Sequence, residues 1–296
     1  PALGYPADGL SAPYQLAILI GSLIWAIVGI IVFSKILRQY FDLFTSSILL
    51  LLIIFGTNYF QLTAYDGTLH AHNFLFAFYS FIIYFTIKWH NAPSYKYAIL
   101  LGIAIGFTIL IRPSEATSIL IPLLWNLHNK ESFKAKFNLV KKHIAQVGLM
   151  IIFCVLTYLP QLFYWKSVTG NYFFYSYVNS GEGFDFMTPY TLKFLFGFRK
   201  GWFIYTPLMI FSVLGFYSLF KRKRSLFYTI LIFCIVNIYI VSSWTCWWYA
   251  GGSFSSRSLM PVYSLLAIPL GYFIEDIRLA RKSTRYMVSG LLALLV

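Results

Sequence analysis

The chain has 296 residues, of which 59% are hydrophobic, 21% aromatic and only 11% charged. Soluble domains carry about 25% charged residues, so this composition excludes a soluble protein and predicts an integral membrane protein. The net charge of +14 comes mainly from basic residues between apolar runs, which is typical of membrane topology rather than of nucleic-acid binding. The three cysteines, Cys154, Cys234 and Cys246, show no CxxC spacing and predict neither a disulfide framework nor a zinc site.

Nine apolar runs follow one another along the chain. Their length and scarcity of charge predict an all-α fold, a polytopic transmembrane helical bundle that forms a single domain over residues 1–296. The runs cover residues 16–37, 43–60, 72–87, 97–111, 115–127, 144–165, 202–220, 226–242 and 259–274. A partial tenth run, residues 286–296, stops at about half of the roughly 20 residues that a span needs. With Pro1 in place of a methionine, this predicts a fragment that is truncated at both ends.

The distribution of lysine and arginine predicts which side of the membrane each loop faces. Cytoplasmic loops carry an excess of these residues, which places the segments around 35–38, 88–96, 130–142, 221–224 and 278–285 inside. The exoplasmic loops are then residues 1–12, 56–71, 166–201 and 243–258. An N-terminus outside, without a signal peptide, predicts an earlier span before Pro1. We therefore expect a protein of the bacterial cytoplasmic membrane with a site that faces outside.

The first candidate site lies at Arg112, between two apolar runs. An ionisable residue is costly there and usually faces a partner or a cavity. Pro113 ends one helix and suits the first turn of the next, which would leave backbone N–H groups free beside Arg112. This predicts a hairpin of two short helices and an anion site at its tip. The alternative is an ion pair between Arg112 and Glu115 at i, i+3 spacing, which is compatible with an anion site if Glu115 orients the guanidinium.

A second candidate lies in the outer segment AYDGTLHAH, residues 64–72. It offers Asp66, His70 and His72 just before a span. Two histidines at i, i+2 face different sides of a helix, so the pattern favours interfacial histidines behind a Thr68 cap over a metal site. No definite cofactor is predicted, although the pattern leaves room for a divalent metal. These residues would bind a polar substrate at the membrane face that also carries Arg257.

The long outer loop, residues 166–201, is rich in aromatic residues. It predicts a structured loop with short interfacial helices. Arg199 and Lys200 could bind a lipid phosphate or act as a cationic anchor at the membrane interface, and the sequence favours neither role over the other. For Glu182 and Asp185, a solvated loop is favoured over an acid–base pair.

The segment WTCWWYAGGSFSSRSLMP, residues 244–261, is the richest candidate. Tryptophan and tyrosine at a membrane boundary are explained by an aromatic belt. An aromatic belt does not explain the glycine pair that precedes SFSSR. Glycines allow the backbone to approach a ligand closely, and Arg257 follows them near the start of the next helix. We interpret Arg257, together with Gly251 and Gly252, as one wall of a binding site.

At these residues the chain resembles the GT-C superfamily of polytopic glycosyltransferases, which contains the protein O-mannosyltransferases and the aminoarabinose transferases of lipid A. The resemblance covers most of the chain and is carried by YDGTLHAHNF, GFTILIRPSEA, the long outer loop and WWYAGGSFSSRSLMP. One departure is Ser256, which stands where the family commonly has a glycine before the arginine.

The resemblance implies transfer of a hexosyl or pentosyl group from a polyprenyl-phosphate-linked sugar to an acceptor lipid, glycan or protein on the exoplasmic face, within the cell envelope. The family's catalytic carboxylate lies in the first outer loop, which would precede Pro1, so Asp8 and Asp66 are only substitutes. The resemblance implies that the carrier phosphate is bound by Arg112, Arg199, Lys200 and Arg257, and that the sugar and isoprenoid are bound by outer-loop aromatics such as Trp247, Trp248 and Tyr249. The other substrate-binding candidates are Glu115, His70 and His72.

Two other classes of function stay open at this point. A transporter or flippase of a lipid-linked or anionic solute also uses a broken helix whose N-terminus points at an anion. A polymerase or ligase of surface polysaccharide would share the long outer loop and the carrier lipid. A carboxylate directly after an upstream first span would favour the enzyme.

Overall fold

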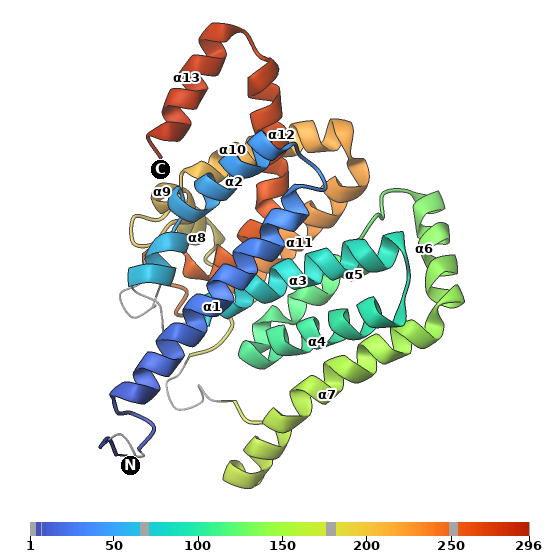
Figure 1. Ribbon diagram of the computed structural model, residues 1–296, viewed down its shortest axis with the longest axis vertical. Helices are drawn as coiled ribbons and strands as arrows, with labels where there is room; N and C mark the ends of the chain where they lie inside the picture. The colour runs from blue at the N-terminus through green and yellow to red at the C-terminus, as the bar shows by residue number, and fades with distance from the viewer. Residues whose placement is uncertain (1–3, 7, 66–70, 176–181, 249–253, 296) are drawn as a thin grey trace.

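The computed structural model describes residues 4–6, 8–65, 71–175, 182–248 and 254–295 (Figure 1). Helices make up 77% of the described residues, which form no strand. The nearest feature to a strand is an isolated antiparallel bridge between Phe184 and Trp244. The predicted all-α class is therefore confirmed.

Among the described residues, four helical segments are long and apolar enough to cross a membrane. They are α1 (Ala12–Leu37), α7 (Ile144–Thr169), α11 (Arg224–Ser242) and the segment Arg257–Leu279, which joins η4 (Arg257–Val262) to α12 (Tyr263–Leu279). Two further apolar helices, α2 (Leu43–Phe55) and α4 (Tyr95–Ile111), are shorter. The protein is thus an integral membrane protein, but the predicted count of nine apolar spans is not confirmed.

Two of the predicted runs are not continuous α-helices. Proline lacks a backbone N–H and clashes with the preceding turn, which explains the division at Pro207, whereas Pro160 and Pro269 lie inside α7 and α12. The run at 115–127 consists of η2 (Pro113–Ile119) and the short α5 (Leu120–Leu124). The run at 202–220 is divided before Pro207 into α9 (Trp202–Tyr205) and α10 (Leu208–Arg222). α3 (His72–Asn91) is continuous.

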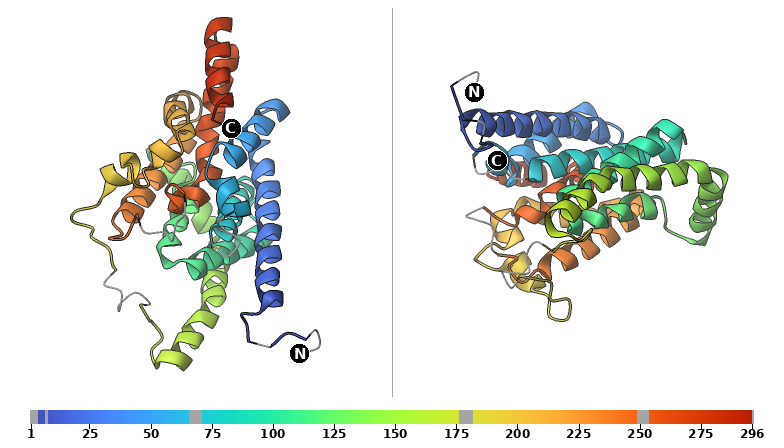
Figure 2. Two further views of the ribbon diagram at one scale, coloured as in Figure 1. Left: turned by 90° about the vertical axis from the view of Figure 1, so that its left-hand side faces the viewer. Right: turned by 90° about the horizontal axis from the view of Figure 1, so that it is seen from below.

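Charged residues gather at one end of the molecule, which we call the basic face and define by Arg38, Asp42, Arg222, Glu275 and Arg278. Arg278 pairs with Asp42 at 2.8 Å, and Arg222 pairs with Glu275 at 2.8 Å. The amphipathic α6 (Lys130–Lys142) adds further lysines, and α13 (Lys282–Ala293) extends beyond this end, opposite the N-terminus (Figure 2).

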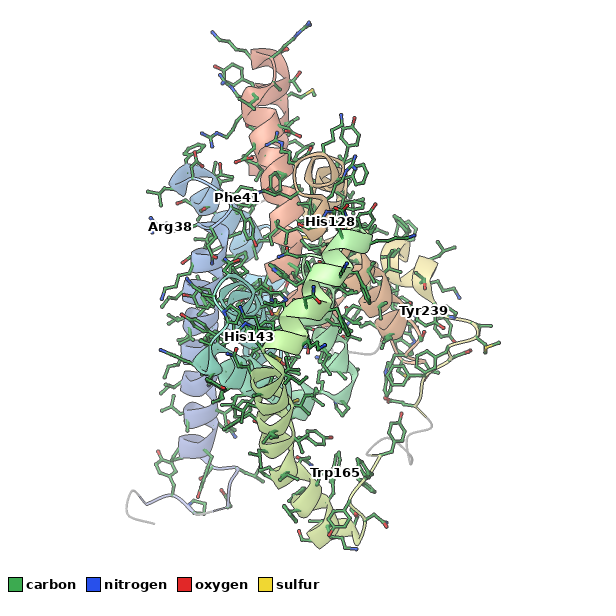
Figure 3. The ribbon with its side chains drawn as sticks, turned by 90° about the vertical axis from the view of Figure 1, so that its right-hand side faces the viewer. Arg38, Phe41, His128, His143, Trp165 and Tyr239 are labelled. Carbon is green, nitrogen blue, oxygen red and sulfur yellow. The ribbon has the colours of Figure 1, made fainter. Side chains whose placement is uncertain are left out.

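The opposite end carries the start of α1, the end of α7 and residues 182–201, and we call it the loop face (Figure 1). Figure 3 separates the two ends, with Arg38 and His128 towards one and Trp165 at the other. The ends of consecutive long helices alternate between the two faces, as the distribution of basic residues predicted.

The segment around Arg112 is a helical hairpin, as predicted. The His90 ring lies 6.4 Å from the Trp125 ring, so the chain that enters α4 just after His90 returns to the same level at the end of α5. Arg112 is therefore at the tip, on the loop face. α11 holds the returning arm, because Thr229 Oγ1 donates to the Leu124 carbonyl at 2.7 Å and Asn237 Nδ2 donates to Thr117 Oγ1 at 3.3 Å.

Glycines allow two pairs of helices to approach closely. A Cβ atom on Gly102 of α4 would lie 2.2 Å from the Met150 carbonyl oxygen of α7, and a Cβ on Gly215 of α10 would lie 2.0 Å from the Pro269 carbonyl oxygen of α12. Small residues at such contacts are a common device of membrane helices. α12 is the central helix, largely buried, whereas α7 lies on the outside with most of its surface exposed.

Candidate functional site

Arg112 at the tip of the hairpin is held by a buried carboxylate. Its backbone is extended between α4 and η2, and its side chain is 35% exposed. Glu115, only 2% exposed, lies 3.8 Å from the guanidinium and accepts a hydrogen bond from the Tyr79 hydroxyl at 2.7 Å. The predicted ion pair between Arg112 and Glu115 is therefore present, and it fixes one side of the guanidinium while leaving the other side accessible.

The predicted row of free N–H groups beside Arg112 is not supported. η2 is a 3₁₀ turn of seven residues, and the Glu115 N–H already donates to the Arg112 carbonyl at 2.9 Å. The tighter i, i+3 pattern closes this bond within the first turn. Anion recognition at this tip therefore depends on the arginine side chain.

Arg257 is positioned by the two serines that precede it. Ser255 has a left-handed backbone with φ of 58°, which is uncommon for a residue other than glycine and marks a constrained turn. Its hydroxyl bonds to Thr206 Oγ1 at 2.9 Å, and Ser256 Oγ donates to the Lys200 carbonyl at 2.8 Å. The start of η4, and with it Arg257, is therefore tied to the end of α9 and to the loop before it.

The described part of the long outer loop is fastened to the end of α11. The N–H of Asp185 donates to the Ser243 carbonyl at 2.7 Å, and the N–H of Thr245 donates to the Gly183 carbonyl at 2.9 Å. The Phe184 ring packs edge-on against Trp244 at 4.9 Å. These contacts bring Glu182, which precedes Gly183, close to Arg112 and Arg257 on the loop face.

A cavity of about 550 Å³ lies between these elements on the loop face. Arg112 and Arg257 both line it, although they are far apart in the sequence. Glu182 is the one carboxylate among its described lining residues. The complete lining consists of Leu110, Ile111, Arg112, Pro113, Ser114, Tyr158, Gln161, Trp165, Phe174, Tyr175, Glu182, Phe184, Ile240, Val241, Trp244, Cys246, Trp247, Ser255, Arg257 and Ser258. We call it the first cavity.

A smaller pocket of about 280 Å³ adjoins the first cavity, and we call it the second pocket. It lies between α8 (Thr191–Phe196), the following turn and residues 245–248. The guanidinium carbon of Arg199 lies 3.7 Å from the centre of the Trp248 ring, a close cation–π contact. Trp247 lines both spaces and forms the wall between them.

The remaining predicted residues are not brought to either space. Asp8 accepts backbone hydrogen bonds from Leu10 at 2.9 Å and Ser11 at 2.8 Å, which hold the pKa of its carboxyl below the usual value and close a turn before α1. His72 is 5% exposed at the start of α3, and Lys200 contributes its carbonyl to the Ser256 contact.

Three predicted residues, Asp66, His70 and Tyr249, lie outside the described residues, as does the glycine pair at 251–252. Within the part of the chain that the structure describes, no group of three or more His, Cys, Asp or Glu side chains is arranged to hold a metal ion.

Several lining residues were not predicted from the sequence. Glu182 was assigned to a solvated loop, and Tyr158, Gln161 and Trp165 were assigned to an apolar span. Gln161 carried the available signal, since it is a polar residue beside Pro160 inside an otherwise apolar helix. Their shared position on the cavity depends on how α7 packs on α4, which a single sequence does not reveal.

Together, the apolar helices and the first cavity define a membrane protein with a cationic site between aromatic walls, suited to a ligand that is anionic at one end and apolar at the other. Residues 10–181, more than half of the chain, match the family described as dolichyl-phosphate-mannose-protein mannosyltransferase. The chain belongs to this family of membrane glycosyltransferases, which use a polyprenyl-phosphate-linked sugar donor, and the resemblance to GT-C enzymes is confirmed. No curated protein and no solved structure matches the chain.

Proposed function

We propose that this glycosyltransferase binds its donor in the first cavity and transfers the sugar to an acceptor on the exoplasmic face, with Arg112 and Arg257 holding the donor phosphate. The observation that carries the proposal is that two arginines from separate elements, the hairpin tip and the start of η4, line one cavity with aromatic side chains. Guanidinium groups bind phosphate oxygens through paired N–H donors, which suits them to this role.

The charge change in the reaction explains why a pair of cations is useful. The acceptor hydroxyl oxygen forms a bond to the anomeric carbon, the bond from that carbon to the phosphate oxygen breaks, and the hydroxyl proton is released. The donor phosphodiester carries one negative charge and the departing polyprenyl phosphate carries two. Because the extra charge develops in the transition state, Arg112 and Arg257 bind that state more tightly than the donor and raise the rate of transfer.

The other lining residues support the sugar and the first part of the isoprenoid. Trp165, Trp244 and Trp247 offer flat apolar surfaces, and the Glu182 carboxylate accepts hydrogen bonds from sugar hydroxyls. Glu115 acts through Arg112, since it is buried beneath the guanidinium and orients it. It is therefore a positioning residue and not a ligand of the donor.

The proposal is tested with the purified protein in nanodiscs, supplied with polyprenyl-phosphate mannose, by measuring the release of polyprenyl phosphate. Removing one donor of a charge-stabilising site costs about 100-fold in rate, so Arg112→Gln and Arg257→Gln are each expected to lower the turnover by about that factor. Arg38→Gln, at the basic face, is the matched control and is expected to leave it unchanged.

Wild-type turnover in both cavity variants would refute the assignment of the donor phosphate. Passage of the intact donor across a proteoliposome membrane, with no release of polyprenyl phosphate, would refute the transferase itself and identify a flippase.

A further inference from the structure

The second pocket is a concentrated cationic site. Its described lining contains Lys193 and Arg199 but no aspartate or glutamate, and both cationic side chains are exposed. The first cavity, in contrast, offsets its two arginines partly with Glu182. A small space that carries two positive charges and no negative one favours a ligand with a compact double negative charge.

Aromatic rings hold both cations without using their hydrogen-bond donors. Arg199 lies over the Trp248 ring, with 3.7 Å between the guanidinium carbon and the ring centre, and the Lys193 ammonium lies 5.9 Å from the centre of the Tyr190 ring. Among the described residues, neither side chain forms a hydrogen bond or an ion pair. A guanidinium stacked on a ring keeps its N–H groups directed outward in its own plane, where a phosphate can accept two of them.

The carboxylate of Asp185, an acid of the same outer loop, is hydrogen-bonded within its own turn. Its carboxylate accepts the N–H groups of Met187 at 3.1 Å and Thr188 at 3.0 Å, together with the Thr188 hydroxyl. These bonds keep Asp185 ionised and fixed in the loop. Arg199 and Lys193 are therefore not held as part of a structural ion-pair network.

Trp247 relates the second pocket to the first cavity. Its indole lines both spaces and is fixed by an edge-on contact with Phe194, at 6.1 Å, whose ring is only 1% exposed. Molecules bound in the two spaces would lie on either side of this one side chain. A two-substrate transfer requires donor and acceptor to be held close together in this way.

We propose that the second pocket binds the acceptor through a phosphate group, so that this enzyme glycosylates a phosphate-bearing acceptor rather than an uncharged one. The inference rests on the proposed function, because it takes the first cavity as the donor site. The phosphate lies between Arg199 and Lys193. It can belong to a membrane lipid or to a soluble phosphorylated glycan, since the recognition chemistry is the same for both.

The test measures binding of three probes to the purified protein in detergent. Dihexanoyl phosphatidic acid represents a lipid-borne phosphate, glucose 6-phosphate represents a soluble one, and farnesyl-phosphate mannose reports on the first cavity. Each lost charge-assisted hydrogen bond weakens binding about tenfold, so the double variant Lys193→Gln, Arg199→Gln is expected to lose about 100-fold for the phosphate probes. Its affinity for farnesyl-phosphate mannose is expected to stay within about twofold of the wild type.

Two further variants sharpen the result. Lys166→Gln removes another exposed lysine of the loop face that lies over a tyrosine ring, at 5.2 Å from the centre of Tyr172, but lines neither space. It is expected to bind all three probes normally. Arg199→Lys keeps the charge but loses the planar donor pair, and is expected to fall between the wild type and the double variant.

Loss of both phosphate probes in the double variant would show that the phosphate alone is recognised, and loss of phosphatidic acid binding alone would assign a lipid acceptor. The proposal is overturned if the wild type binds neither phosphate probe, if the double variant binds them normally, or if it loses farnesyl-phosphate mannose equally. Failure of the donor assignment is seen separately, as unchanged binding of farnesyl-phosphate mannose by Arg112→Gln and Arg257→Gln.

Discussion

Replacing Gly102 by alanine tests whether the close approach of α4 and α7 builds the first cavity. The new Cβ would lie 2.2 Å from the Met150 carbonyl oxygen, about 1 Å closer than a normal contact allows, and the obstacle is backbone that cannot rotate away. α7 must therefore move outward by about that distance. Overpacking of this kind costs roughly 1–3 kcal/mol, offset by about 1 kcal/mol from the better helix propensity of alanine.

The matched control is Gly148→Ala on α7, where nothing lies within 4 Å of the new Cβ. We expect this variant to be as stable as the wild type or more stable by up to about 1 kcal/mol, because only the propensity changes. Gly102→Ala should be less stable than the wild type by about 0–2 kcal/mol, the cost of overpacking less the gain in helix propensity. Thermal unfolding in detergent gives the comparison. The same outward shift displaces Trp165, so affinity for farnesyl-phosphate mannose should fall only in Gly102→Ala. Equal stability of the two variants would refute the reasoning.

Two other predictions concern the turn before Arg257 and the basic face. Ser255→Val places a β-branched residue at φ of 58° and removes the hydrogen bond to Thr206. It should lower the stability measured by thermal unfolding by roughly 2–3 kcal/mol and weaken donor binding. Ser255→Gly keeps the backbone conformation and should lower the stability by only about 1 kcal/mol. Hydrogen bonds from Thr45 and Arg278 lower the pKa of Asp42 from 3.8 to about 2. The folded-state pKa is below the unfolded one, so the stabilisation is complete above about pH 4 and is lost as the pH falls towards 2. Asp42→Asn should remove this part of the acid sensitivity, measured by the midpoint of thermal unfolding between pH 5 and pH 3.

Each of these two has a clear contrary result. If Ser255→Val binds the donor as well as Ser255→Gly, the left-handed turn does not position Arg257. If Asp42→Asn keeps the full loss of stability on acidification, the pair with Arg278 does not contribute to it. Neither result would bear on the second pocket.

Local signals predicted the hairpin and the loop face well. Pro113 removes a backbone donor and disfavours helical backbone at Arg112, which favours the observed break, and the spacing of Arg112 and Glu115 predicted their ion pair. The prediction of nine spans was less successful because hydropathy reports that a run is apolar, not that it is one continuous helix. Pro207 divides an apolar run without lowering its hydropathy much.

The composition of the site was the harder part to predict. The sequence predicted Glu182 to be a solvated loop residue. In the structure, the bridge between Phe184 and Trp244 brings it to the first cavity. The sequence also does not reveal that Arg199 lies in a different pocket from Arg112 and Arg257. All three are cationic and lie on the loop face, so only the tertiary structure separates them. The sequence predicted one phosphate site there, and only the position of Trp247 divides it into two spaces.

The exposed surface of α7 has a consequence for how the enzyme selects its carrier lipid. One side of this helix contributes Tyr158, Gln161 and Trp165 to the first cavity, while its other side leaves Leu156 49% exposed and Phe163 60% exposed. A polyprenyl tail can lie along that apolar side and remain in the bilayer while only the phosphosugar passes beyond the helix. If the first cavity is the donor site, as proposed, it makes no contact with the distal tail, and carriers of different isoprenoid length should compete equally for the same sugar transfer.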